Sequence, residues 1–205
     1  MSFDRQTTLR APVTLTGIGV HSGAPATICL KPSSANSGIV FLRQGLENAP
    51  AQLIHAKHTK VSATELCTVI GDRASASVAT IEHLMSACAG LGLDNVLVEI
   101  DGPEMPIMDG SAGPFVFLLQ SAGIEEQRTP KRFVRIKKTV RIEDGDKWAQ
   151  FDPFDGFKVN FEIEFDHPIF KKRAQRASMD FSTTSFLKEV SRARTFGFMR
   201  DLETL

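Results

Sequence analysis

The chain has 205 residues, of which 42% are hydrophobic and 23% charged, and its acidic and basic residues balance to a formal net charge of zero. This balance excludes a global electrostatic attraction to nucleic acid or to a membrane surface. Its three widely spaced cysteines exclude a cysteine-rich structural zinc site and are typical of a reducing cytosol, so we expect a cytoplasmic protein. No apolar run approaches the roughly 20 residues that a transmembrane helix needs, and we expect no such segment.

The first part of the chain predicts strands followed by helices. Apolar residues alternate in the early segments, and Pro12 marks the first of them as an edge strand. Helical spacing follows, with Ser77 or Thr80 as the expected cap of the first helix and Gly90 and Gly92 as its stop. We expect strands at 7–15, 26–30, 38–43, 66–70 and 95–100, and helices at 78–91 and 114–122.

The second part repeats this plan after a polar stretch at 123–131, which we interpret as the domain boundary. Strands are expected at 133–142, 147–151, 157–165 and 176–181, followed by a helix that Ser182 or Thr183 caps. We therefore predict an α+β fold of two similar two-layer domains, each a small, mainly antiparallel sheet packed against helices. The first domain, 1–124, carries Glu82 and His83, and the second, 130–205, is incomplete.

The adjacent residues Glu82 and His83 give the strongest functional signal. Neighbouring helix positions point about 100° apart, so both side chains can reach one small object near the helix start. Neither residue lies on the apolar stripe of its helix. A neutral imidazole is a good zinc ligand, and a carboxylate beside a metal can accept a proton from the bound water. The dipeptide is also common on ordinary helix surfaces, and the pair alone leaves that interpretation open.

Two further segments allow both a structural and a functional interpretation. His21 lies in a glycine-rich run at 17–23, which is typical of a hairpin turn and equally of a close approach to a ligand. The tripeptide Asp109-Gly110-Ser111 favours a structural turn before a helix.

Six motifs follow one another along the chain: Gly-Ile-Gly-Val-His-Ser-Gly (17–23), Thr-Ile-Glu-His-Leu-Met-Ser-Ala (80–87), Gly-Leu-Gly-Leu-Asp-Asn (90–95), Pro-Glu-Met-Pro-Ile-Met-Asp-Gly-Ser-Ala (103–112), Asp-Gly-Asp-Lys-Trp-Ala (144–149) and Ser-Arg-Ala-Arg-Thr-Phe-Gly-Phe-Met-Arg-Asp (191–201). In order and spacing they closely resemble the bacterial UDP-3-O-acyl-N-acetylglucosamine deacetylases of lipid A biosynthesis. The resemblance runs from about residue 5 to the end of the chain.

This resemblance implies a zinc-dependent amidohydrolase of a Gram-negative bacterium. Such an enzyme removes acetate from the nitrogen of a UDP-linked, 3-O-acylated glucosamine, at a site formed by two α+β domains. By resemblance, His83 is the first zinc ligand and Glu82 the general base that activates water. Thr195 matches the threonine that stabilises the reaction intermediate, and Phe196 flanks the same pocket.

The remaining site residues are also taken from the resemblance. Lys147 and Phe165 match positions that meet the UDP portion, as a cation for the diphosphate and a ring that stacks on uracil. His21 and Leu66 match positions that line the pocket near the sugar. We expect no nucleic-acid partner.

One departure from the family pattern limits these expectations. The family completes its zinc site with a His-Lys-x-x-x-Asp run and adds a later catalytic histidine, and this chain has no such run. We interpret the chain as C-terminally truncated within the acyl-passage insert, with an incomplete zinc site, weak zinc binding and no turnover. Apolar surface left open by the absent part would favour self-association. The alternative is a non-catalytic sugar-nucleotide-binding or interaction module on the same fold.

Overall fold

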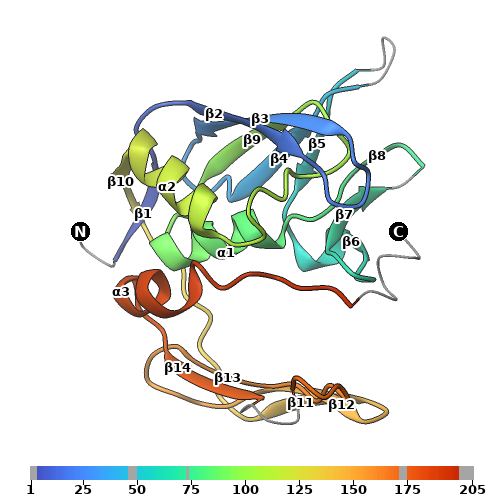
Figure 1. Ribbon diagram of the computed structural model, residues 1–205. Coiled ribbons are helices and arrows are strands. Elements are labelled where there is room, and N and C mark those ends of the chain that lie inside the picture. The colour runs from blue at the N-terminus through green and yellow to red at the C-terminus, as the bar shows by residue number, and fades with distance from the viewer. Residues whose placement is uncertain (1–3, 46–49, 73, 171–174, 199–205) are drawn as a thin grey trace. The chain divides into compact units, whose positions relative to one another are not determined.

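The computed structural model describes residues 4–45, 50–72, 74–170 and 175–198 (Figure 1). Its contacts divide the chain into two units, Met1–Lys131 with Leu187–Leu205 and Arg132–Phe186. Both units contain small sheets of mainly antiparallel strands, and the predicted α+β class is confirmed. The domain limits 1–124 and 130–205 stay a prediction, and within this chain the residues from Leu187 onward group with the first unit.

A five-stranded sheet forms the centre of the first unit. Its strands lie in the order β2-β3-β9-β4-β5, and β4 and β9 are the parallel pair among antiparallel neighbours. Every second residue is buried in β3 and β9, which shows that one face of the sheet is covered. The bounds are β2 Val13–Ile18, β3 Pro25–Pro32, β4 Ile39–Arg43, β5 Gln52–His55 and β9 Val96–Ile100.

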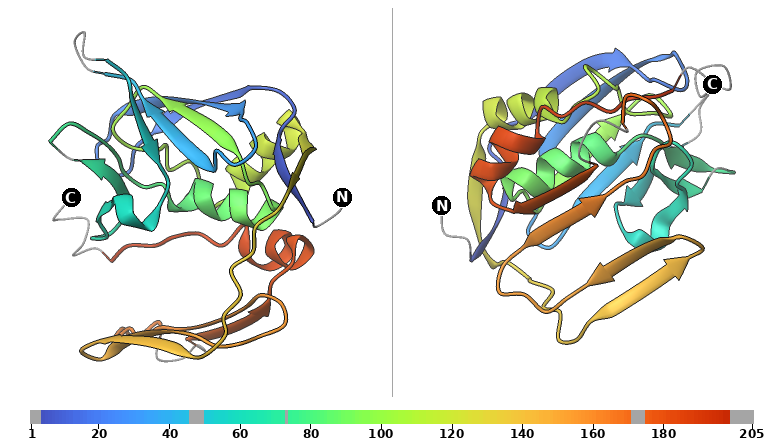
Figure 2. Two further views of the ribbon diagram at one scale, coloured as in Figure 1. Left: turned by 180° about the vertical axis from the view of Figure 1, so that it is seen from behind. Right: turned by 60° about the horizontal axis from the view of Figure 1, so that its bottom comes forward.

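Two helices, α1 (Glu82–Leu91) and α2 (Gly113–Ala122), lie side by side against this face (Figures 1 and 2). Their buried side chains include Leu84, Phe115 and Leu119, which are fully shielded from solvent. Burying a side chain of this size stabilises the folded state by about 1.5–3 kcal/mol relative to leaving it exposed. The helix–sheet layer is therefore the main core of the first unit.

The predicted strand at 7–15 is wrong as a single element. The chain bends at Arg10 and Ala11 and forms two strands, β1 (Arg5–Leu9) and β2. β2 lies at the edge of the central sheet, as Pro12 led us to expect. The bend sends β1 away from that sheet to pair with β10 (Ile124–Pro130).

The polar stretch at 123–131, where no strand was expected, contains the regular strand β10. This polar stretch is an antiparallel strand of the first unit, with Thr7, Thr8 and Leu9 of β1 opposite residues 124–126. Its polar side chains are needed because they take part in hydrogen bonds with the rest of the unit. One of them, Gln127, accepts from Asn95 and donates to the carbonyl oxygen of Ser33 at 2.8 Å.

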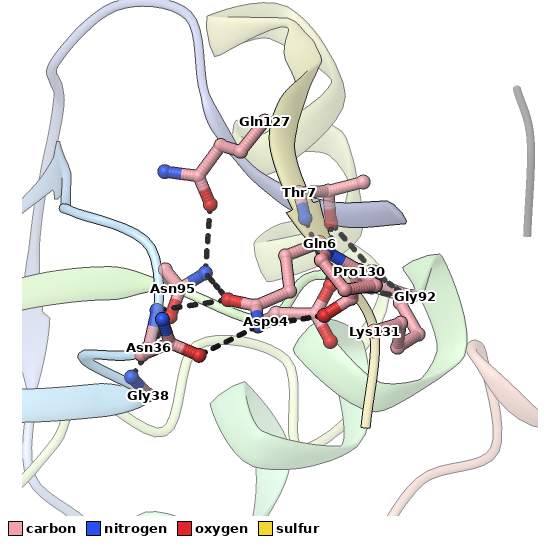
Figure 3. A network of polar contacts seen from close by, with 10 residues as sticks. All are labelled: Gln6, Thr7, Asn36, Gly38, Gly92, Asp94, Asn95, Gln127, Pro130 and Lys131. Atoms are coloured by element: carbon pink, nitrogen blue, oxygen red, sulfur yellow. Dashed lines mark hydrogen bonds and ion pairs between the residues drawn. The ribbon is translucent and has the colours of Figure 1, made fainter. Parts of the chain in front are cut away.

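Asn95 is the centre of this polar network, which Figure 3 shows. Its amide nitrogen donates to Gln6 Oε1 at 2.9 Å and to Gln127 Oε1 at 2.7 Å, and its Oδ1 accepts from the backbone nitrogen of Gly38 at 2.9 Å. The Asn95 side chain is almost fully buried, so each of these bonds replaces one to water. The network joins the β1–β10 ribbon to the start of β4 and β9.

A second part of the network closes the C-terminal end of α1 (Figure 3). Gly92, with φ of 70°, ends the helix, and its carbonyl oxygen accepts from Thr7 Oγ1 at 2.6 Å and from Lys131 Nζ at 3.0 Å. Asp94 accepts from the Thr7 backbone nitrogen at 2.8 Å and pairs with Lys131 at 3.1 Å. A cation at this end also interacts favourably with the helix dipole.

The predicted helix at 78–91 begins four residues late. Residues 76–78 form β8, and Thr80 has a left-handed φ of 58°, which no helix accommodates. Ser77 and Thr80 are therefore not the cap, and the helix starts after Ile81 with no side-chain cap bond.

β8 (Ala76–Val78) belongs to a small antiparallel sheet with β6 (Val61–Ala63) and β7 (Val69–Asp72), and a short 3₁₀ turn, His58–Lys60, precedes β6. The predicted strand at 66–70 begins three residues late, because Leu66 also has a left-handed φ, of 58°.

The second unit consists of two hairpins and a short helical segment. β11 (Val140–Asp144) pairs with β12 (Lys147–Phe151) across a tight turn at Gly145, and β13 (Lys158–Glu162) pairs with β14 (Arg176–Asp180). The strand predicted from residue 133 begins only at Val140, since 133–139 have no partner strand. Ser182 caps α3 (Thr183–Ser185) by accepting from the Ser185 backbone nitrogen at 3.1 Å, and the helix continues as a π-helical turn, Phe186–Val190.

In the described part of the chain, the helices are too short or too polar to cross a lipid bilayer.

Candidate active site

Glu82 and His83 occupy the first turn of α1, and both side chains are half-buried. Glu82 Oε2 accepts a hydrogen bond from the backbone nitrogen of Thr68 at 3.0 Å, and the Ile81 nitrogen donates to the Thr68 carbonyl oxygen at 3.4 Å. The start of the helix is thus fastened to the segment that leads into β7. Among the described residues, only one of the two Glu82 oxygens takes part in a hydrogen bond.

Leu66 lies two residues before Thr68 and is 62% exposed. Its left-handed φ of 58° turns the side chain out of the strand pattern, and a leucine tolerates this conformation poorly. The structure therefore brings an exposed apolar side chain into the segment that contacts Glu82.

His21 is connected to α1 through Glu104. The Glu104 carboxylate accepts from the backbone nitrogen of His21 at 3.0 Å, from that of Ser22 at 2.8 Å and from Thr80 Oγ1 at 3.0 Å. Burial opposes ionisation of this carboxylate, but the hydrogen bonds from His21, Ser22 and Thr80 outweigh it and lower the pKa of Glu104 below its usual value. The ionised Glu104 carboxylate therefore holds the glycine-rich turn beside Thr80, two residues before Glu82.

Residues 103–110, called here the 103–110 segment, contact both of these regions through the backbone as well. The Ala79 nitrogen donates to the Pro103 carbonyl oxygen at 2.9 Å, and the Met105 nitrogen donates back to the Ala79 carbonyl oxygen at 3.0 Å. Farther along, the Ile107 nitrogen donates to the Ile18 carbonyl oxygen at 3.0 Å. The segment is thus paired with the approach to α1 and with the start of the His21 turn.

Thr195 meets the far end of the same segment. Its backbone nitrogen donates to the Gly110 carbonyl oxygen at 2.8 Å, while its side chain is exposed. Phe196 follows with half of its surface exposed, and its ring lies 5.8 Å from that of Phe198. The motif that carries Thr195 extends to residue 201, and its last three positions lie outside the described residues.

Asp109 and Ser111 have the structural role that the sequence favours. Asp109 Oδ1 accepts from the Ser111 hydroxyl at 2.7 Å and from the Ser111 backbone nitrogen at 3.0 Å, and the hydroxyl bond is the main cause of a lowered Asp109 pKa. Ser111 Oγ in turn accepts from the Gly113 nitrogen at 3.1 Å, at the start of α2. This turn sets the direction of the chain after the 103–110 segment.

Backbone strain collects around these contacts. Four non-glycine residues in the described part of the chain have positive φ, and three of them belong to the segments above: Leu66, Thr80 and Met108. Each such conformation costs on the order of 1–3 kcal/mol and persists only where surrounding contacts enforce it. Strain of this kind is concentrated at functional sites in proteins, which makes this region the candidate active site.

Lys147 and Phe165 belong to the second unit, and each is described there by itself. Lys147 is exposed at the start of β12, directly after the turn that follows Asp144. The Phe165 ring is half-buried 5.4 Å from the Phe170 ring, and its backbone nitrogen donates to Gln175 Oε1 at 2.9 Å.

The candidate site offers an incomplete set of metal ligands. Within the described ranges, no three His, Cys, Asp or Glu side chains are close enough together to hold a metal ion. Catalytic zinc usually has three protein ligands, and the described residues supply one candidate, His83. Burial raises the pKa of the Cys88 thiol to about 12, so this cysteine stays protonated and belongs to the core.

Glu104 is the site residue that sequence reasoning missed. It is 3% exposed, whereas an acidic residue is rarely buried unless it is paired or hydrogen-bonded. The available signal was its position in an otherwise apolar run between two prolines, Pro103 and Pro106. A single carboxylate in such an apolar run indicates a buried, hydrogen-bonded group more than an exposed loop residue.

Comparison with known proteins shows the family to which the chain belongs. A sequence model of the family LpxC, UDP-3-O-acyl N-acetylglycosamine deacetylase, matches residues 6–205. The chain is 54% identical over 201 residues to the UDP-3-O-acyl-N-acetylglucosamine deacetylases of Methylococcus capsulatus and Vibrio campbellii, and 54% identical over 200 residues to that of Shewanella baltica. These matches cover 98% of the chain and 65% of each relative. The chain thus spans about two thirds of the relatives' length, and it belongs to the LpxC family of UDP-3-O-acyl N-acetylglycosamine deacetylases.

Proposed function

We propose that this chain forms the water-activating and sugar-binding part of a zinc-dependent amidohydrolase. The reaction is hydrolysis of the acetamide of UDP-3-O-acyl-N-acetylglucosamine, which gives the free amine and acetate for lipid A biosynthesis. The observation that carries this proposal is the 103–110 segment, which contacts the His21 turn, the approach to Glu82 and the backbone of Thr195. The names of the relatives supply the substrate class.

Glu82 is the proposed general base. The Thr68 nitrogen holds Oε2 and thereby fixes the orientation of the carboxylate. The other oxygen can then accept a proton from the water that attacks the amide carbonyl, and the carboxylic acid so formed can return the proton to the departing nitrogen. General acid–base catalysis of this kind contributes about 10²–10⁴-fold to a rate.

Thr195 is proposed to stabilise the tetrahedral intermediate. Its hydroxyl can donate a hydrogen bond to the oxygen on which negative charge develops. The bond from its backbone nitrogen to Gly110 fixes the residue at one end of the 103–110 segment. A donor that is oriented before the reaction needs no reorganisation at the transition state, which is the source of its effect.

His83 is proposed as one ligand of a zinc ion, whose remaining ligands come from outside the described residues. The described side chains do not meet the ligand number of catalytic zinc by themselves. The curated relatives are longer than this chain, which supports further ligands in the part of their sequence that it does not span. We therefore propose zinc dependence for the complete site and weak zinc binding for the 205-residue chain.

The remaining residues are proposed to bind the substrate. His21 and Leu66 supply a hydrogen-bonding ring and an exposed apolar side chain near the sugar, and Phe196 extends the apolar surface beside Thr195. Lys147 supplies a cation for the diphosphate, and Phe165 supplies a ring that can stack on uracil.

The second candidate function is a sugar-nucleotide-binding module without catalysis. The observation in its favour is the same shortage of metal ligands among the described residues. It predicts that the chain binds a UDP-sugar and releases no acetate in any form of the protein. The strained, well-fastened surroundings of Glu82 favour the enzyme, because a binding module does not require an oriented base.

The test compares the gene product expressed from its full reading frame with the 205-residue chain. We expect the gene product to hold about one zinc per molecule and to release the free amine from the UDP-sugar. His83→Ala in that protein should abolish both. The 205-residue chain should hold little zinc and release no amine.

Two results would overturn parts of this proposal. Binding of the UDP-sugar by the zinc-loaded gene product without release of acetate would favour the binding module. Full turnover by the 205-residue chain alone would contradict the incomplete zinc site.

A further inference from the structure

Glu104 is a buried carboxylate that accepts three hydrogen bonds from two separate segments. Its two oxygens accept from the backbone nitrogens of His21 and Ser22 and from the hydroxyl of Thr80, at 2.8–3.0 Å. The donors come from the glycine-rich turn and from the residues just before α1, which are about 60 positions apart in the sequence. One buried carboxylate is therefore the polar link between these two segments.

Thr80 needs this link because of its backbone. A β-branched residue at φ of 58° is unfavourable, and Thr80 is almost fully buried, so its hydroxyl also needs a partner. The bond to Glu104 Oε1 satisfies the hydroxyl and holds the residue in the left-handed conformation. Two positions later the chain reaches Glu82, so the conformation of Thr80 sets the direction in which the helix and its first carboxylate begin.

Gly19 shows how closely the turn approaches the carboxylate. A Cβ atom added at Gly19 would meet Glu104 Oε2 at 2.3 Å and the Ser22 hydroxyl at 2.4 Å. Any other residue at this position would therefore displace the Glu104 side chain or open the turn. The glycine is required by the contact with Glu104, since nothing unusual in its own φ demands it.

We propose that Glu104 is a positioning residue of the deacetylase site, which fixes the His21 turn against the start of α1 and so sets the spacing between His21 and Glu82. It acts through these residues and touches no reacting atom. The inference rests on the proposed function, and it adds a residue that supports the site without contacting the reacting atoms. Removal of the carboxylate should therefore lower catalysis in protein that is still folded and still holds zinc.

The experiment uses the gene product from its full reading frame, loaded with zinc. Glu104→Gln keeps the size of the side chain but turns one acceptor into a donor that faces the Ser22 nitrogen. We expect kcat/KM to fall by about 10-fold or more, as for a lost positioning contact, with zinc content unchanged. Amide hydrogen exchange in residues 17–23 should become faster, which reports the loosened turn without reference to activity.

Variants of Thr80 and Gly19, which both lie against Glu104, test the same contact. Thr80→Val removes the hydroxyl and should resemble Glu104→Gln, whereas Thr80→Ser keeps the hydroxyl and should restore most of kcat/KM. Gly19→Ala should lower kcat/KM as well. Combined with Glu104→Gln it should add little, because both changes break one contact. Glu99→Gln is the matched control, since Glu99 pairs with Lys31 on β3, away from this contact.

The outcomes separate the two proposals. Wild-type kcat and KM in Glu104→Gln, or fully additive losses in the double variant, would overturn the role of Glu104. Absence of deacetylation in the zinc-loaded wild-type protein would overturn the proposed function instead. Should Glu104→Gln fail to fold, Thr80→Val decides: unchanged kcat/KM and unchanged exchange at 17–23 would refute the inference.

Discussion

The two ends of helix α1 are held in opposite ways. At the C-terminal end, Gly92, Asp94 and Asn95 take part in a network of hydrogen bonds in which both polar atoms of the Asn95 side chain have partners (Figure 3). At the N-terminal end there is no side-chain cap, and a left-handed Thr80 is kept in place by the buried carboxylate of Glu104.

If the proposed site is correct, this difference separates stability from chemistry along a single helix of ten residues. Bonds at the C-terminal end replace contacts with water and stabilise the fold. At the N-terminal end, the left-handed Thr80 lies two residues before Glu82, the residue proposed as the general base. Substitutions at the two ends should therefore affect different measurements, and the following variants test that separation.

The largest effect is expected at the N-terminal end, from Glu82→Gln. The glutamine oxygen can still accept from the Thr68 nitrogen, so the fold should persist, but the amide cannot accept a proton. We expect kcat of the zinc-loaded gene product to fall by about 10²–10⁴-fold, with a thermal midpoint close to that of the wild type. A wild-type kcat in this variant would remove Glu82 as the base.

A smaller effect, on stability alone, is expected at the C-terminal end from Asn95→Ala. The change leaves the Gly38 nitrogen, Gln6 and Gln127 without a shared partner in a buried position. We expect the free energy of unfolding in urea to fall by about 2–3 kcal/mol, while kcat of the folded fraction stays unchanged. Glu125→Ala, an exposed change on β10, the strand that carries Gln127, should stay within about 0.5 kcal/mol of the wild type.

The smallest effect is expected from Gly92→Ala, which tests the helix end without removing a side-chain bond. An added Cβ meets only Lys131 Nζ at an ordinary distance of 3.7 Å, so the cost comes from the φ of 70°. We expect a loss of about 1 kcal/mol in the free energy of unfolding. Gly92→Asn should lose less, because asparagine tolerates this conformation. Equal losses for the two variants would point to packing as the cause.

The sequence predicted the regular elements where pattern and local geometry agree. The alternation in 26–30, the near-continuous apolar run in 95–100 and the helical spacing in 114–122 correspond to β3, β9 and α2 within a few residues. Turns that depend on one residue were also predictable: Gly92 ends α1, and Ser182 caps α3. In each of these cases the decisive contact lies within a few positions of the residue itself.

The predictions from sequence were wrong where a residue far away in the sequence determines the local conformation. The polar stretch at 123–131 resembles a linker until β1 pairs with it. From its local sequence Thr80 is a reasonable helix cap. In the structure its hydroxyl donates a hydrogen bond to Glu104, 24 positions later, and Thr80 lies outside the helix. Glu82 and His83 were found from chemistry and resemblance, but the contacts that orient them come from segments that no spacing rule connects. Their roles in the site stay predictions.

The 103–110 segment has a consequence for the integrity of the molecule. Because it contacts the His21 turn, the approach to α1 and the backbone of Thr195, a single peptide bond cleaved inside it would release all three at once. A nick at the exposed turn around Gly145, between β11 and β12, would disturb none of these contacts. Limited proteolysis within the 103–110 segment should therefore loosen the first unit, whereas a cut at the Gly145 turn should leave that unit folded.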